Sequence, residues 1–215
     1  SILNSSLNDL RISDAFSGAR RSRLIPGGSI FTTSIVLRDE MSNGRIDVVI
    51  GNWNQENQLL FKSCDGKKFS DKFDKVMENN IKSNQLLCNL VIPEMVKRND
   101  GSIIIISSIG GLKGSNLLGA YNISKAADIM MVKNIAAEFG RNNIRANSIA
   151  PGLIKTDFSK ALWEDQSVYN KIIKAIPQAR MGEPDDISGM ALYLASDASD
   201  FITGSMFVVD GGLTT

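Results

Sequence analysis

Short apolar runs rich in β-branched residues alternate with longer helical stretches from residue 45 to the end of the sequence. The clearest run is residues 102–107, Ser-Ile-Ile-Ile-Ile-Ser, which predicts a buried strand. The same patterns predict strands at 46–50, 144–150 and 206–209, and helices at 73–98, 121–139 and 185–194. Such alternation is typical of an α/β fold in which helices cover both faces of a parallel sheet.

Two of the expected helices carry features that bear on their shape and packing. Pro93 lies inside the first helix and is expected to bend or break it. Gly140 is expected to end the second helix, at 121–139. The apolar residues of this second helix cover more than one stripe, which predicts that it is buried on two sides.

Composition excludes several classes of partner. The sequence has 215 residues, enough for one domain with a substantial core, and its 24 basic residues nearly balance 23 acidic ones. No basic stripe indicates a nucleic-acid partner, and no apolar run approaches the roughly 20 residues that span a bilayer. The sequence does not open with a secretory signal pattern. Cys64 and Cys88 lack the CxxC spacing, so we expect free thiols in a cytoplasmic protein.

The sequence contains no histidine. Ser-His-Asp hydrolysis, Cys-His proteolysis and histidine-ligated zinc or iron are therefore excluded, and we expect no metal centre. Acid–base chemistry must come from tyrosine, lysine, aspartate or glutamate side chains.

The strongest chemical signal lies between residues 108 and 125. Tyr121 and Lys125 are four residues apart and so share one face of a helix. An ammonium group beside a phenol stabilises the phenolate, which makes Tyr121 a candidate proton donor to a carbonyl oxygen. Ser108 follows the strand at 102–107, and open α/β sheets bind ligands at the carboxyl ends of their strands. Taken alone, a tyrosine and a lysine at this spacing are more often structural than catalytic.

Residues 1–45 fit the pattern least well. Residues 29–36 have the β-propensity of a strand, while the segment from Arg20 to Gly28 predicts a loop. Arg20, Arg21 and Arg23 are able to bind a cofactor phosphate, although arginines on a solvated turn are the commoner interpretation.

From residue 45 onward the sequence resembles the short-chain dehydrogenase/reductase (SDR) family, and the matching motifs come in the family's order. Residues 44–50 resemble its fourth strand, and Asn80 falls where the family has a structural and relay asparagine. Ser108, Tyr121 and Lys125 fall on its catalytic serine, tyrosine and lysine. Residues 149–157 resemble the loop beside the nicotinamide, and 180–186, 194–204 and 209–212 resemble the C-terminal signature. Residues 91–212 look closest to the carbonyl reductase and 3-oxoacyl reductase branch.

The resemblance implies a single domain over residues 1–215 with a Rossmann-like, doubly wound parallel sheet. It implies that Tyr121 protonates a carbonyl oxygen, or deprotonates the alcohol in reverse, and that Ser108 holds that oxygen. Lys125 would support Tyr121 and bind the nicotinamide ribose, and Asn80 would kink its helix around a relaying water.

The resemblance also implies a cofactor, NAD or NADP, which the sequence does not distinguish. The residues expected to bind it are Asn52, Tyr121, Lys125, Pro151, Gly152, Ile154 and Thr156. Residues 157–183 would form a substrate lid, with Phe158, Leu162 and Trp163 as pocket walls. Two simpler interpretations stay open: Thr156 caps the helix that follows, and Trp163 packs only within the lid.

The sequence departs from the family at two places. The family's N-terminal strand, TGxxxGxG loop and helix are missing or atypical, since Gly18, Gly27 and Gly28 do not have that spacing. Residues 51–54 read Gly-Asn-Trp-Asn, which puts the large Trp53 where the family has a small residue. A segment within residues 1–45, such as 29–36, is expected to cover the strand edge left open; otherwise the chain is a truncated or altered form of a longer parent.

Three functions follow. The first is an NAD(P)-dependent oxidoreductase acting on a small carbonyl or alcohol. The second is a non-catalytic SDR-like binding or assembly protein, which the absent glycine loop favours. The third is a cofactor-independent relative such as a dehalogenase, although such relatives carry arginine where this chain has Lys125. The family's pairing of the helices that match 73–98 and 120–139 implies a homodimer or homotetramer.

Overall fold

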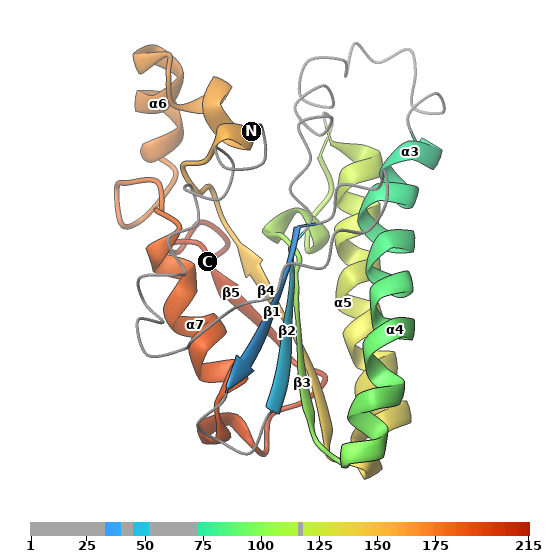
Figure 1. Cartoon of the computed structure of the whole chain (residues 1–215). Helices are drawn as coiled ribbons and strands as arrows, with labels where there is room; N and C mark the ends of the chain where they lie inside the picture. Colours follow the sequence, from blue (N-terminus) through green and yellow to red (C-terminus); the bar gives the residue numbers. More distant parts are fainter. Residues whose placement is uncertain (1–32, 40–44, 52–72, 116–117) are drawn as a thin grey trace, which may run out of the picture.

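The computed structural model describes residues 33–39, 45–51, 73–115 and 118–215 (Figure 1). Its strands form one sheet in the order β1-β2-β3-β4-β5, in which β2, β3, β4 and β5 run parallel. The strands are β1 (Thr33–Asp39), β2 (Arg45–Gly51), β3 (Gly101–Ile106), β4 (Ile144–Pro151) and β5 (Met206–Val209). The α/β architecture expected from the sequence is confirmed.

Strand β1 makes the sheet mixed rather than wholly parallel. It pairs antiparallel to β2 from Thr33↔Gly51 to Asp39↔Arg45. Only residues 40–44 join these two strands, and a parallel pair would need a crossover of about a dozen residues or more. The chain therefore covers this edge of β2 with its own preceding segment, as expected. The described part of this strand runs from Thr33 to Asp39, and residues 29–32 of the expected strand lie outside the described residues.

The expected helix at 73–98 is one continuous helical run with an irregular turn. It comprises α3 (Phe73–Met77), the π-helical turn η1 (Glu78–Lys82) and α4 (Ser83–Arg98). Of the bend or break expected at Pro93, the break does not occur, since α4 continues past it to Arg98. The departure from regular α-helix lies instead at the turn that contains Asn80.

Helices cover both faces of the parallel part of the sheet. α4 and α5 (Gly119–Phe139) lie side by side on one face, and α7 (Asp185–Ala195) lies on the other (Figure 1). Because side chains alternate along a strand, Ile103 and Ile105 of β3 pack against α4 and α5, whereas Ile104 packs against α7. This two-sided burial explains the unbroken isoleucine run.

Among the described residues, helix α5 is buried on one side and partly exposed on the other, in contrast to the expectation from its apolar residues. Val132 and Ile135 face the core, but Ile123 is 46% exposed and Met130 is 54% exposed. The first pair packs between the sheet and α4, while neither member of the second pair belongs to that core cluster.

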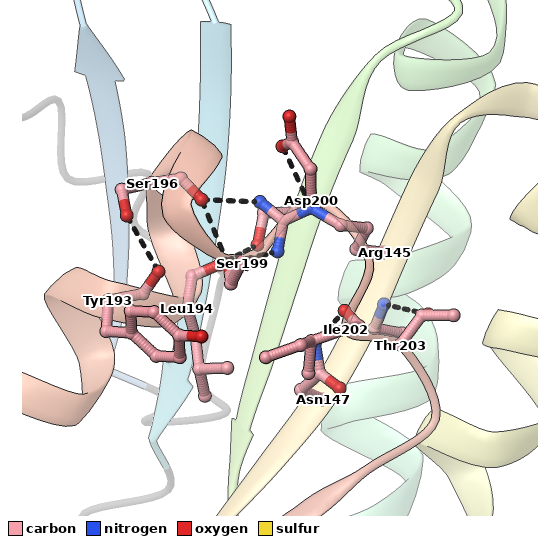
Figure 2. Close-up of polar contacts among 11 residues, drawn as sticks. Arg145, Asn147, Tyr193, Leu194, Ser196, Ser199, Asp200, Ile202 and Thr203 are labelled. Atoms are coloured by element: carbon pink, nitrogen blue, oxygen red, sulfur yellow. Dashed lines mark hydrogen bonds and ion pairs between the residues drawn. The ribbon is translucent and has the colours of Figure 1, made fainter.

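The segment 194–205 is held to the sheet by the polar contacts drawn in Figure 2. The Arg145 guanidinium donates to the carbonyl of Leu194 at 2.8 Å and to Ser199 Oγ at 2.7 Å. Asn147 donates to the carbonyl of Ile202 at 2.8 Å, and its Oδ1 accepts from the Ser205 N–H at 3.0 Å. These contacts place β5 beside β4.

The remaining described elements are short or lie in residues 157–183, the segment expected to form a lid. They are η2 (Ile109–Gly111), η3 (Gly140–Asn142), η4 (Asp157–Leu162), α6 (Gln166–Ile173) and η5 (Asp197–Ser199). Among the described residues, no helix has the length and apolar character needed to cross a membrane.

Candidate active site

The loop after β3 lies directly on the first turns of α5. Ser108 has an extended backbone, and its hydroxyl accepts a hydrogen bond from the Gly110 N–H at 3.0 Å. A Cβ on Gly111 would lie 2.7 Å from the carbonyl carbon of Lys125, so only glycine permits this approach. The close contact holds the loop that carries Ser108 against the part of α5 that carries Tyr121 and Lys125.

Tyr121 and Lys125 share one face of α5, as their spacing predicts. The Lys125 Nζ lies 5.8 Å from the centroid of the Tyr121 ring. The Tyr121 ring is half-buried, and the ring of Phe158 at the start of the lid lies 6.1 Å from it, centroid to centroid. A phenol is thus placed beside an ammonium group, with the aromatic ring of Phe158 near it.

The Lys125 ammonium is buried and held by two acceptors. Its Nζ donates to the carbonyl of Ile106 at 3.0 Å and to Asp128 Oδ2 at 3.0 Å. Burial acts to lower the pKa of Lys125, but the charge of Asp128 and the nearby Tyr121 outweigh it, so this pKa lies above the ordinary lysine value. The ammonium therefore stays charged in spite of its burial.

Two matched polar pairs join the helices beneath this site. Asn80 Nδ2 donates to Ser124 Oγ at 2.9 Å, and Asn84 Nδ2 donates to Asp128 Oδ1 at 2.8 Å. The Ser124 hydroxyl donates in turn to the carbonyl of Tyr121 at 2.7 Å. All four paired side chains are buried, so they fix the distance and rotation between the two helices.

Asp128 and Asn84 were not among the site residues predicted from the sequence. Asp128 follows Lys125 by three residues and Tyr121 by seven, so all three lie on one helix face. An acidic residue at that spacing was the available signal. Asn84 gave no comparable signal, because its partner lies 44 residues away.

The residues after β4 are occupied mainly with contacts inside the protein. The Gly152 N–H donates to the carbonyl of Val209 at 2.9 Å, and a Cβ on Gly152 would lie 2.6 Å from that of Asp210. Ile154 forms an isolated parallel β-bridge with Gly182. This stretch thus joins the C-terminal turn and the base of the lid.

The base of the lid is fixed by Thr156. Its N–H donates to Ser159 Oγ at 3.1 Å, and its carbonyl accepts from Trp163 Nε1 at 3.2 Å. These contacts agree with the simpler interpretations of Thr156 as a helix-start residue and of Trp163 as lid packing. Leu162, the last residue of η4, is half-buried.

A cavity of about 380 Å³ lies between the lid and the end of β5, lined among others by Leu153, Ile154, Arg180 and Asp210. Neither Ser108 nor Tyr121 lines it. Asn52, Trp53, Cys64 and the arginines at 20, 21 and 23, which also figured in the expectations, lie outside the described residues.

Comparison with known proteins identifies the family. The family model described as enoyl-(acyl carrier protein) reductase matches residues 27–214. Dehydrogenase/reductase SDR family member 4 of Oryctolagus cuniculus is 40% identical over 170 residues, which are 79% of this chain and 64% of that protein. The chain belongs to the SDR family.

Further SDR relatives include a bacterial reductase. The 3-oxoacyl-(acyl-carrier-protein) reductase of Chlamydia trachomatis serovar D is 39% identical over 168 residues, 78% of this chain and 65% of its own length. The chain thus spans slightly less than two thirds of each of these two curated relatives.

Solved SDR structures share the fold. Gluconate 5-dehydrogenase from Burkholderia cenocepacia, in complex with NADP and tartrate, superimposes with a TM-score of 0.67 at 33% identity, over 69% of this chain and 58% of its own. A 3-oxoacyl-(acyl-carrier protein) reductase from Brucella melitensis with bound NAD gives a TM-score of 0.63 at 32% identity, over 70% and 55%. The Rossmann-like fold expected from the resemblance is confirmed, with β1 as its antiparallel edge.

Proposed function

We propose that this chain is an NAD(P)-dependent oxidoreductase that reduces a small carbonyl, or oxidises the matching alcohol, by a Ser-Tyr-Lys mechanism. The observation that carries the proposal is the buried Lys125 ammonium, 5.8 Å from the centre of the Tyr121 ring. Both lie beside the Ser108 loop at the carboxyl end of β3, where sheets of this kind bind ligands. Membership of the SDR family supports the same reaction class.

Each residue has a distinct role in this mechanism. Tyr121 donates its phenolic proton to the carbonyl oxygen of the substrate, and the ammonium of Lys125 stabilises the phenolate that remains. Ser108 donates a hydrogen bond to the same oxygen and so orients it toward Tyr121. Asn80, through Ser124, holds the first turn of α5 in place. Phe158 closes the lid side and limits the access of water to Tyr121.

The described residues fit the nicotinamide half of the cofactor. NAD(P)H supplies the hydride when it is bound. An ammonium has three donors, and Ile106 and Asp128 accept two from Lys125, so one donor can serve a ribose hydroxyl. Pro151, Gly152, Ile154 and Thr156 would line the nicotinamide side, at the carboxyl end of β4. Two solved relatives, one with NADP and one with NAD, leave the choice between these cofactors open.

The mechanism is tested by turnover with NADH and NADPH against a panel of aldehydes and ketones. Tyr121→Phe removes the donated proton, so kcat/KM is expected to fall by about 10²-fold or more. Tyr193→Phe is the matched control, since Tyr193 is an exposed tyrosine on α7 and its loss should leave turnover unchanged. Equal activity in wild type and Tyr121→Phe would refute the mechanism.

The second candidate is a non-catalytic SDR-like binding or assembly protein. The lack of a TGxxxGxG motif in the sequence favours it, because that loop brings backbone N–H groups to the cofactor pyrophosphate. Absence of turnover together with absence of any thermal shift on adding NADH or NADPH would favour this candidate.

We also propose that the chain forms a homodimer or homotetramer through α4 and α5. An open groove of about 960 Å³ runs between these helices, with Pro93, Val96 and Met130 among its lining residues. Leu90 and Met130 expose 72% and 54% of their surfaces, both on these helices. Apolar surface of this kind is stabilised by burial against a second copy.

A further inference from the structure

Asp128 is a fully buried acidic residue for which the proposed mechanism has no role. Its side chain has no exposed surface, and it lies on α5, three residues after Lys125. A carboxylate in such a place is costly unless each oxygen has a partner. The free-energy cost of burying this carboxylate indicates that Asp128 has a role other than packing.

Both carboxylate oxygens have partners from different elements. Oδ2 accepts from Lys125 Nζ at 3.0 Å, on the same helix, and Oδ1 accepts from Asn84 Nδ2 at 2.8 Å, on α4. The carboxylate is thus held by α4 while it holds the lysine of α5. Its position does not depend on the flexible lysine side chain alone.

We propose that Asp128 is a positioning residue that keeps the Lys125 ammonium charged and aimed at the Tyr121 side of the site. This inference rests on the proposed Ser-Tyr-Lys function for its consequence, but the state of Lys125 can be measured without turnover. Asp128 and the Ile106 carbonyl take two donors of the ammonium, which leaves one for the ribose hydroxyl of the proposed function.

The groups that face this pair support the assignment. Tyr121 lies on α5, Cys88 lies on α4, and β3 contributes the carbonyl of Ile106. Burial raises the pKa of Cys88 to about 12, with a contribution from Asp128, so the thiol is neutral. Burial also raises the pKa of Asp128, and the charge of Lys125 and the hydrogen bonds from Lys125 and Asn84 oppose that effect. Without Asp128, burial would govern Lys125 and favour the neutral amine, which cannot stabilise a phenolate.

The first test measures the titration of Lys125 by NMR in protein with labelled lysine, its signal assigned by its loss in Lys125→Met. In Asp128→Asn the Lys125 signal is expected to titrate about 1–3 pH units lower than in wild type. Glu94→Gln is the matched control, because Glu94 and Lys97 form an ion pair at the same i, i+3 spacing but exposed to solvent. Unchanged titration of Lys125 in Asp128→Asn would overturn the proposal.

The second test measures the pH profile of kcat. Its alkaline limb is expected to move to lower pH in Asp128→Asn by the same amount as the NMR titration, with KM at neutral pH little changed. A limb that stays in place in an active enzyme would overturn the proposal. If wild type shows no turnover while the NMR shift appears, the oxidoreductase function fails and the role of Asp128 in holding the ammonium stands.

A third variant keeps the proposal testable if Asp128→Asn does not fold. Lys125→Met combined with Asp128→Leu removes both charges together. Recovery of the folded state in this double variant supports the proposal, because it identifies the unpaired ammonium as the cause of unfolding. A double variant that also fails to fold would overturn it, since Asp128 would then serve packing rather than Lys125.

Discussion

Cys88 shows how burial sets the chemistry of a single side chain in this protein. The thiol lies in the core cluster between α4, α5 and the sheet, with 1% of its surface exposed. Burial, and secondarily the charge of Asp128, raises its pKa to about 12. Because the thiolate is the reactive form, Cys88 is an inert packing residue in the folded state.

Alkylation tests this at the level of the residue. In a Cys64→Ser background, iodoacetamide at about pH 8 should label folded Cys88 about 10³-fold more slowly than the unfolded chain, which matches a thiol pKa several units above the usual value. Mass spectrometry before and after addition of urea measures the difference. Rapid labelling of the folded protein would contradict the burial of this thiol.

At the scale of elements, the site depends on how closely the loop after β3 approaches α5. Gly111 permits this approach, since its missing Cβ would lie 2.7 Å from the carbonyl carbon of Lys125. The π-helical turn η1 acts on the neighbouring helix, because it carries Asn80, whose side chain bonds Ser124 on α5. The proposed catalytic residues are thus held by contacts between elements rather than by α5 alone.

A substitution at Gly111 tests that contact. Gly111→Ala should lower the free energy of unfolding by about 1–3 kcal/mol through overpacking, and should lower kcat by displacing Ser108. Gly114→Ala is the control on the same loop, because a Cβ there meets no atom within 4 Å. Urea unfolding measures the first effect. Equal stability of the two variants would show that the loop can move without cost.

At the scale of the whole molecule, two surfaces matter: the edge of strand β2 and the apolar face of α4 and α5. β1 pairs antiparallel along the edge of β2, so the edge of the described sheet is formed by β1 and not by the parallel strand β2. The apolar face of α4 and α5 has no such cover within the described part of the chain, and Leu90 is 72% exposed there. This is the face that we propose pairs with a second copy.

Charge on that face should prevent assembly. Leu90→Glu combined with Met130→Glu is expected to give a monomer in sedimentation or light-scattering measurements, because apolar contacts would be replaced by buried like charges. Phe201→Glu is the control, as Phe201 is fully exposed elsewhere, just after η5. A wild-type chain that is already monomeric at high concentration would contradict the proposed pairing.

Local sequence patterns were sufficient to predict most of the helices and strands, and to predict that Tyr121 and Lys125 lie together. The isoleucine run of β3, the length of α5 and the shared face of Tyr121 and Lys125 follow from periodicity within a few residues of chain. The position of Ser108 follows from the end of β3 in the same way. Such features depend on short-range geometry, which any parallel α/β arrangement preserves.

Contacts between segments that are distant in the sequence determined the features that local patterns did not predict. The antiparallel direction of β1 depends on its pairing with β2, and the solvent-exposed Met130 depends on where the packing of α4 and the sheet against α5 ends. The partnership of Asp128 with Asn84 joins residues 44 positions apart. Neither periodicity nor spacing encodes such contacts, because they arise only when the folded chain brings separate helices and strands together and removes water from between them.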